Sequence, residues 1–301
     1  MASEETRPST VWLLLRACRP KQWTKNAIVL APLVFAERAL VPRDVLGALV
    51  GFALFCAASS GLYLVNDLCD LEEDRLHPQK RLRPLASGQL GRGLATGTAL
   101  LLLLVPAGIG VAVASRFGLV LISYVLLIAA YSFGLKSVVI LDLFVLATGF
   151  VLRAVAGAVI INAEISDWLL VCTFFLALFL ALCKRRHERV LLGESAHEHR
   201  AVLSHYTPYL LDQMIVAVAA GVMLSYTLYT VAPETVAKFG TTNLKFTVPF
   251  VLMGVFRYLY LVHRREQGGA PEMVLLTDLP LILIILIWAA VVALVVYVLP
   301  T

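Results

Sequence analysis

Long apolar stretches, each about the length of a membrane-spanning helix, follow one another through almost the whole sequence. Such a helix needs roughly 20 apolar residues, and lipid is the solvent that favours so much exposed apolar surface. Of the 301 residues, 60% are apolar and only 15% are charged, whereas a soluble domain carries about a quarter charged residues. The composition therefore excludes an ordinary soluble enzyme and a disordered chain.

Hydropathy divides the chain into nine candidate spans joined by polar connections. They are residues 25–41, 44–66, 94–114, 117–134, 138–162, 166–183, 209–231, 244–263 and 279–299. The runs are continuous and do not alternate in tens, which excludes a membrane β-barrel. The predicted fold is an all-α, polytopic bundle of about nine transmembrane helices, and residues 1–301 form a single integral membrane catalytic domain.

The distribution of positive charge predicts the orientation of this bundle. Of the 25 Lys and Arg residues, 18 lie in the N-terminal segment and in the loops after spans two, four, six and eight. Cytoplasmic loops carry such an excess, so we expect a cytoplasmic N-terminus in a multi-pass protein of the inner (plasma) membrane. Residues 1–24 then form a cytoplasmic segment, and loops 67–93 and 184–208 form an active site that faces the cytoplasm.

An acidic cluster stands at the end of the second span, where Asp67, Asp70 and Asp74 follow Asn66. On a helix these carboxylates lie within about 60° of arc, where they repel one another. Oxygen ligands favour a hard divalent ion, and Mg²⁺ characteristically bridges a few carboxylates to substrate phosphates. Four cations follow directly, namely Arg75, Lys80, Arg81 and Arg83. This pairing favours a diphosphate site over a solvated helix end that only stops insertion.

Further polar side chains are expected at the cytoplasmic mouth of the bundle. The candidates for substrate binding are Lys21, Gln22, Lys25, Asn26, Asn66, Arg81, Arg83, Tyr131, Lys136, Asp142, Arg153, Lys184, Arg185 and Arg186. Asp142 and Arg153 are eleven residues apart in the fifth span, so they can face one side of its helix. The cationic runs 19–25 and 184–189 either grip phosphate or anchor the protein at the interface.

The motif Asn66-Asp67-x-x-Asp70-x-x-x-Asp74 resembles the first aspartate motif of the UbiA-type intramembrane prenyltransferase superfamily. The resemblance implies that Asp67 and Asp70 hold Mg²⁺, that Asn66 contacts a diphosphate and that Asp74 is a ligand or a support. These three aspartates are then the catalytic set. The second aspartate motif of the aromatic prenyltransferases is absent, because Cys183-Lys-Arg-Arg-His-Glu-Arg189 stands in its place.

The segments RPKQWTKN at 19–26, CKRRHE at 183–188, 131–136 and 142–153 are similar to the decaprenyl-phosphate phosphoribosyltransferase branch of that superfamily. This resemblance implies Mg²⁺-dependent transfer of 5-phosphoribosyl from 5-phosphoribosyl 1-pyrophosphate to a polyprenyl phosphate, with release of pyrophosphate. The product would serve cell-wall arabinan synthesis. The implied partners are both substrates and the lipid bilayer, with no nucleic acid, and the resemblance allows a homo-oligomer.

Two alternatives remain open at this stage. An aromatic prenyltransferase would use a prenyl diphosphate, although the cations at 184–186 argue against it. A transporter would place its polar residues near the membrane midplane, whereas these carboxylates cluster at one end. Near the C-terminus, Glu272 and Asp278 either close over a sugar or cap the last span.

Overall fold

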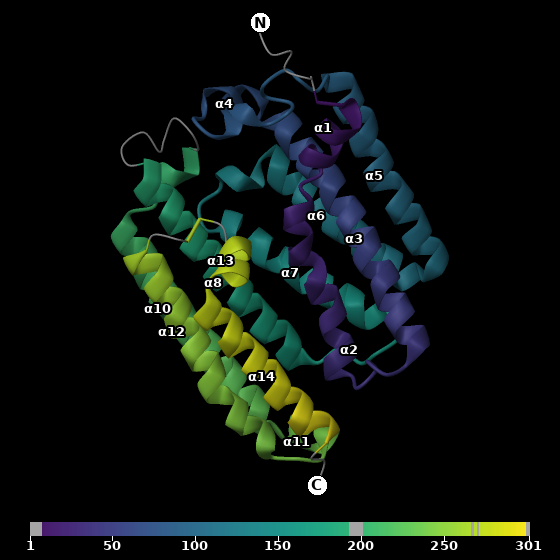
Figure 1. Ribbon diagram of the computed structural model, residues 1–301, viewed down its shortest axis with the longest axis vertical. Helices are drawn as coiled ribbons and strands as arrows, with labels where there is room; N and C mark the ends of the chain where they lie inside the picture. Colours follow the sequence, from purple (N-terminus) through teal and green to yellow (C-terminus); the bar gives the residue numbers. More distant parts are fainter. Residues whose placement is uncertain (1–7, 193–200, 266–267, 270, 299–301) are drawn as a thin grey trace, which may run out of the picture.

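The computed structural model describes residues 8–192, 201–265, 268–269 and 271–298, and these form helices and turns without a strand. Within these ranges, eight helices are long and apolar enough to cross a membrane. They are α3 (Pro42–Cys69), α5 (Arg92–Val113), α6 (Ser115–Phe133), α7 (Leu141–Ile160), α8 (Asp167–Leu192), α10 (Pro208–Val231), α12 (Val248–Arg264) together with the 3₁₀ helix η6 (Asn243–Thr247) that leads into it, and α14 (Leu279–Tyr297). The predicted helical bundle is confirmed (Figure 1).

The first predicted span, 25–41, differs from a regular transmembrane helix. After the short helix α1 (Thr10–Ala17), the chain forms a 3₁₀ helix, η1 (Pro20–Leu30), and then the five-residue helix α2 (Ala31–Phe35). Residues 36–41 lie outside any helix. A 3₁₀ helix rises about 2.0 Å per residue, so η1 and α2 together extend roughly 30 Å, about the thickness of a bilayer core. The segment therefore reaches across with fewer residues than an α-helix needs.

Close backbone packing holds this first segment inside the bundle. It contacts α3 and α7, and it approaches α7 at Gly157, where a Cβ atom would clash with the carbonyl oxygen of Val29. Val29 itself is fully buried. Only glycine permits this approach, so packing against α7 fixes the path of η1.

Successive long helices are neighbours, in the order α3, α5, α6, α7, α8, α10, α12 and α14. The last helices close the bundle against its first segment: α13 (Pro271–Thr277) contacts η1, and the hydroxyl of Tyr297 donates to the carbonyl of Val34 at 3.3 Å. Between α3 and α5, the connection forms α4 (Leu71–Leu76) and the 3₁₀ turn η2 (Lys80–Leu82). Figure 1 shows α1 and α4 together at one end of the bundle.

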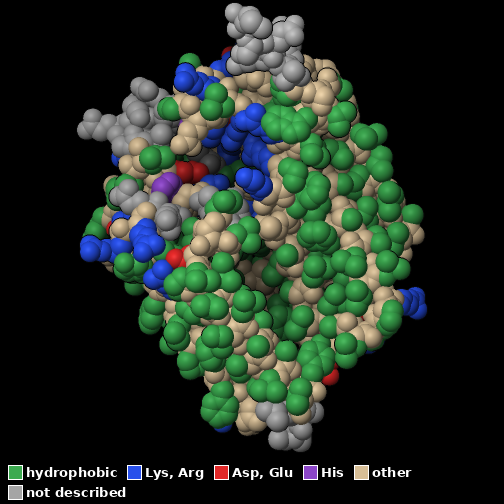
Figure 2. All heavy atoms as spheres, viewed as in Figure 1, with side chains coloured by type: hydrophobic (Ala, Val, Ile, Leu, Met, Phe, Trp, Pro, Cys, Tyr) green, Lys and Arg blue, Asp and Glu red, His purple; other side chains and the backbone are tan. Residues whose placement is uncertain are grey.

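The outer surface is apolar along the length of the helices. On α5, for example, Leu100, Leu101 and Leu104 are 53%, 61% and 68% exposed. Figure 2 shows hydrophobic side chains over most of one face, and Lys and Arg gathered in the upper part of that face, beside a hollow. Such a surface suits lipid along its sides and an anionic ligand at one end.

Replacement of Gly157 tests the close contact with the first segment. We expect Gly157→Ala to lower the free energy of unfolding by about 1–3 kcal/mol, because the added methyl group overpacks against Val29. Gly97→Ala is the matched control, since nothing lies within 4 Å of a Cβ atom there. Thermal unfolding in detergent measures both variants, and equal midpoints for the two would contradict this account.

Candidate active site

The three aspartates of the motif lie where α3 gives way to α4. Asp67 belongs to the last turn of α3, Asp70 forms its C-cap with a non-helical ψ of 12°, and Asp74 belongs to α4. The side chains of Asp67 and Asp74 are only 3% and 1% exposed, and that of Asp70 is 13% exposed. Carboxylates buried this deeply require positive charge close by.

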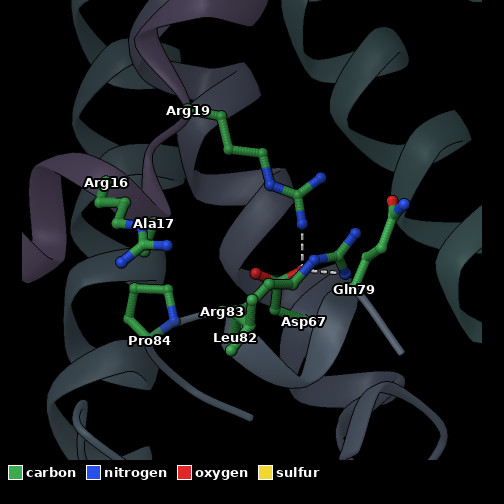
Figure 3. Close-up of a pocket in the computed structure, with 8 residues that line it drawn as sticks. All are labelled: Arg16, Ala17, Arg19, Asp67, Gln79, Leu82, Arg83 and Pro84. Carbon is green, nitrogen blue, oxygen red and sulfur yellow. Dashed lines mark hydrogen bonds and ion pairs between the residues drawn. The ribbon is translucent and has the colours of Figure 1, made fainter. Parts of the chain in front are cut away.

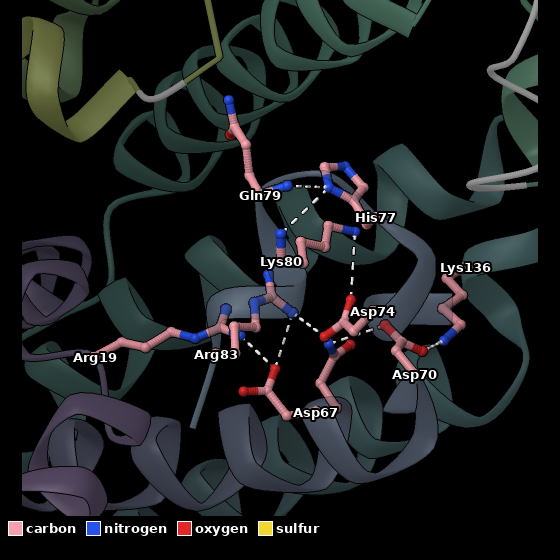
Figure 4. A network of polar contacts seen from close by, with 10 residues as sticks. Arg19, Asp67, Asp70, Asp74, His77, Gln79, Lys80, Arg83 and Lys136 are labelled. Atoms are coloured by element: carbon pink, nitrogen blue, oxygen red, sulfur yellow. Dashed lines mark hydrogen bonds and ion pairs between the residues drawn. The ribbon is translucent and has the colours of Figure 1, made fainter. Parts of the chain in front are cut away.

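Cations from separate segments face these carboxylates (Figure 4). Arg19 pairs with Asp67. Arg83 donates to Asp67 at 3.1 Å and to Asp74 at 2.5 Å. Lys80 lies 3.8 Å from Asp74. Lys136, in the 3₁₀ turn η3 (Leu135–Ser137), pairs with Asp70. Cations up to 66 residues away in the sequence therefore reach the aspartates with which they pair.

Arg19 begins the cationic run 19–25, although it is not one of the individual candidates for substrate binding. It lies between α1 and η1 in the left-handed region, with φ 52° and ψ 61°. A non-glycine residue in this region costs about 1–3 kcal/mol and persists where its surroundings hold it. Asp67 and the ring of Tyr63, 5.0 Å from the guanidinium carbon, hold Arg19. Burial lowers the pKa of Arg19, and nearby Asp67 opposes that fall.

The donor set of this cluster suits a hard divalent cation. The oxygens are carboxylates, and within the described part of the chain the buried Asp74 Oδ1 has no hydrogen-bond partner. In the described ranges, no three His, Cys, Asp or Glu side chains are gathered as a metal site, since each aspartate faces Lys or Arg instead. Lys80 lies 3.8 Å from Asp74 Oδ1. Burial lowers the pKa of Lys80, and the charge of Asp74 opposes that fall. Asp67, Asp70 and Asp74 thus fit Mg²⁺ by their chemistry.

A second network of hydrogen bonds is centred on the buried Asp142. Arg185 donates to Asp142 at 2.5 Å and to Glu188 at 2.7 Å. The Tyr206 hydroxyl donates to Asp142 at 2.9 Å and accepts the backbone N–H of Ile140 at 2.6 Å. Tyr206 is fully buried, and burial is the main reason that its pKa rises to about 12. The network joins α7, α8 and the residue that follows the 3₁₀ turn η5 (Ala201–His205).

The backbone of Ile140 connects this network to the turn that carries Lys136. Its φ of 69° is rare for a β-branched residue, and the bond to Tyr206 fixes it. Ile140 lies four residues after Lys136, so the strained turn sets where η3 presents Lys136 to Asp70. The sequence offered no signal for Tyr206, which is 64 residues away from Asp142.

Asn26 and Arg153 meet each other within the bundle. Arg153 donates to the amide oxygen of Asn26 at 2.8 Å, to the Tyr124 hydroxyl at 2.6 Å and to the Gly149 carbonyl at 3.1 Å. Its guanidinium also lies over the rings of Tyr124 and Phe150, at 4.5 and 4.9 Å. Among the described residues, these bonds link η1, α6 and α7 and do not extend to the aspartates.

The remaining predicted residues have separate surroundings. Asn66 donates to Asp70 at 3.0 Å, within the motif itself. Gln22 and Lys25 bond to each other, Arg186 donates to Asp212 at 2.5 Å, and Tyr131 is buried beside Arg185. Lys21 and Arg81 are exposed, and Lys184 is half-buried.

Of the two acidic residues near the C-terminus, Asp278 has a described side chain and Glu272 does not. Asp278 caps α14 by accepting the N–H of Leu281 at 3.0 Å, and both its oxygens accept from Arg257, at 3.0 and 2.8 Å. The hydrogen bond from Arg257 is the main reason that the pKa of Asp278 is lowered. Asp278 therefore caps the last span. The side chain of Glu272, like loop residues 193–200, lies outside the described residues.

Known proteins and a family model match this chain over most of its length. The model of the UbiA prenyltransferase family matches residues 27–277. Decaprenyl-phosphate phosphoribosyltransferases of Corynebacterium glutamicum and Mycolicibacterium smegmatis are 36% and 30% identical, covering 95% and 98% of this chain and 87% and 98% of theirs. A UbiA homolog from Archaeoglobus fulgidus, solved with GPP and Mg²⁺, superposes with a TM-score of 0.70 at 20% identity, covering 95% of this chain and all of that one. This last likeness shows the fold.

The hydroxyl of Tyr206 is open to a direct test. We expect Tyr206→Phe to lower the free energy of unfolding by about 1–3 kcal/mol, because Ile140 and Asp142 each lose a buried hydrogen bond. Tyr209→Phe is the matched control, since Tyr209 is 74% exposed. The comparison uses thermal unfolding midpoints in detergent, and an unchanged midpoint for Tyr206→Phe would refute the role of this bond.

Proposed function

Because the chain belongs to the UbiA prenyltransferase family, we propose that it transfers a 5-phosphoribosyl group from 5-phosphoribosyl 1-pyrophosphate to a polyprenyl phosphate. The observation that carries this proposal is the likeness to two decaprenyl-phosphate phosphoribosyltransferases over nearly the full length. The acidic cluster and its cations support it, since this donor carries a diphosphate. Use of the product in cell-wall arabinan synthesis stays a prediction.

The aspartates are proposed to hold the diphosphate end of the donor. Asp67 and Asp70 would hold Mg²⁺, with Asp74 as a third ligand or a support. When bound, the ion supplies positive charge that neutralises the departing pyrophosphate. Arg83 and Lys136 are proposed to bind the phosphate oxygens, which is supported by their ion pairs with Asp67 and Asp70.

The acceptor needs little activation in this scheme. Its phosphate oxygen is already anionic, so no strong general base is required. It would attack C1 of the ribose from the side opposite to the pyrophosphate, which predicts inversion at that carbon. The polyprenyl tail would lie against lipid-facing helices while its phosphate stays at the interface.

The cationic run 184–186 divides into two roles in this proposal. Arg185 and Arg186 are engaged by Asp142 and Asp212, so they are proposed to shape the wall of the site and hold its charge. Lys184 is half-buried and is proposed to contact the acceptor phosphate. The proposed role of the two arginines differs from that of an interfacial anchor, because they form ion pairs with carboxylates on other helices.

Product analysis tests the proposed reaction. Purified protein with Mg²⁺, a polyprenyl phosphate and 5-phosphoribosyl 1-pyrophosphate should yield a lipid whose mass has increased by one phosphoribosyl group. A parallel incubation with a prenyl diphosphate and an aromatic acceptor should yield no prenylated product. The opposite pattern would identify an aromatic prenyltransferase, and substrate flux into vesicles without conversion would identify a transporter.

The aspartates are tested by changes that keep their size. We expect Asp67→Asn and Asp70→Asn each to lower kcat by on the order of 100-fold, since each removes charge from the proposed diphosphate site. Glu72→Gln is the matched control, because Glu72 lies in the same acidic run but is 73% exposed. Activity as a function of Mg²⁺ concentration is the readout. Full activity in both aspartate variants would exclude these side chains from the reaction.

The proposed orientation places this site at the cytoplasmic face of the plasma membrane. Cys69 is exposed beside Asp70, so a variant that keeps only this cysteine should react with a membrane-impermeant maleimide in inverted vesicles and not in intact cells. Lys238→Cys in a cysteine-free chain is the control, since Lys238 lies in α11 (Pro233–Phe239), beyond the other end of α10. The reverse labelling pattern would contradict the orientation.

A further inference from the structure

A cavity of about 300 Å³ opens beside Asp67, next to the N-terminal helix α1. Arg16, Arg19 and Arg83 line it, and Asp67 is the one acidic residue in its lining (Figure 3). Figure 3 shows Arg19 and Arg83 directed toward Asp67 from two sides, while Arg16 stands at a wall formed by α1. The cavity therefore adjoins the acidic cluster but is itself positively charged.

The ion pairs leave this cavity with unbalanced positive charge. Arg19 and Arg83 share one oxygen of Asp67, and Arg83 also serves Asp74. Within the described residues, Arg16 has no carboxylate partner, and its guanidinium lies over the Trp12 ring at 5.5 Å. Three guanidinium groups on a concave surface match a ligand with several anionic oxygens.

The backbone supports the same conclusion. Arg19 occupies the left-handed region immediately before Pro20, which itself restricts the preceding residue. Strained residues of this kind gather at ligand-binding positions. The bend turns the chain from α1 into η1 and presents Arg19 to the cavity (Figure 3).

Exposed apolar side chains on α1 indicate that the cavity lies at the depth of lipid head groups. The helix α1 exposes Val11, Trp12 and Leu15, at 76%, 50% and 53%. A short helix with exposed aliphatic side chains and a Trp beside Arg lies in the interface plane. On the opposite wall, Leu82 is 62% exposed. A phosphate attached to a membrane lipid and a phosphate from solution can both reach this position.

We propose that the Arg16–Arg19–Arg83 cavity binds a phosphate monoester, separate from the diphosphate at the aspartates. The inference rests on the proposed function, in which two groups have this chemistry: the 5-phosphate of the donor and the phosphate of the lipid acceptor. Both must lie near the diphosphate when the ribose is transferred. The cavity shares Asp67 and Arg83 with the diphosphate site, which places the two sites side by side.

Binding of simple monoesters tests this site without turnover. Ribose 5-phosphate and a short-chain polyprenyl phosphate are titrated separately against detergent-purified protein, without Mg²⁺ or pyrophosphate. We expect Arg16→Gln to raise the Kd of one of the two at least tenfold, and Arg16→Lys to recover part of that loss. Arg16 is exposed and has no ion pair among the described residues, so this variant is expected to fold. Arg19→Gln should weaken the same probe.

The two probes identify the source of the phosphate. Loss of ribose 5-phosphate binding assigns the cavity to the donor, and loss of polyprenyl phosphate binding assigns it to the acceptor. Arg92→Gln is the matched control, because Arg92 is 64% exposed, pairs with Glu72 and does not line the cavity. An equal loss in Arg92→Gln, unchanged Kd values in Arg16→Gln, or failure of the wild-type protein to bind either probe would overturn the proposal.

The monoester-binding experiment and the product analysis can fail independently of each other. If no phosphoribosyl lipid forms but Arg16→Gln still weakens monoester binding, the cavity stands and the transfer reaction falls. If the lipid forms and Arg16→Gln leaves both Kd values unchanged, the reaction stands and the cavity proposal falls.

Discussion

The structure depends on how three carboxylates are neutralised at the end of α3. Asp67 and Asp74 are almost fully buried at the mouth of an apolar bundle, where an unpaired charge would cost several kcal/mol. The balancing cations come from elsewhere in the chain: the α1–η1 junction supplies Arg19, the loop after α4 supplies Arg83, and η3 supplies Lys136. Neutralisation therefore draws otherwise independent segments together and builds the site in the same step.

Much of the fold was predictable because every helix that crosses lipid must be long and apolar. Eight predicted spans correspond to continuous helices, and the motif from Asn66 to Asp74 lies at a helix end, as predicted. The first span could not be predicted in form, since its 3₁₀ geometry depends on the approach of Val29 to Gly157, more than 100 residues away. Hydropathy reports how apolar a segment is, and it does not report which backbone it packs against.

The site was predictable where chemistry is local and was missed where it depends on tertiary contacts. The aspartates and Lys136 carry their signal in the sequence and meet in the structure. Arg19 belongs to the cationic run 19–25, but its pairing with Asp67 depends on a strained φ that the sequence does not reveal. Tyr206 has no signal in the sequence, because it owes its place to a bond with Ile140. In the described structure, the predicted residues Asn26 and Arg153 hold helices together instead of facing the aspartates.

A structure of the protein with 5-phosphoribosyl 1-pyrophosphate and Mg²⁺ bound would test the central claim most directly. The account predicts density for the pyrophosphate against Asp67 and Asp70, with Arg83 and Lys136 turned from the carboxylates toward phosphate oxygens. Density for the donor elsewhere in the bundle, with the present ion pairs of the aspartates intact, would contradict it.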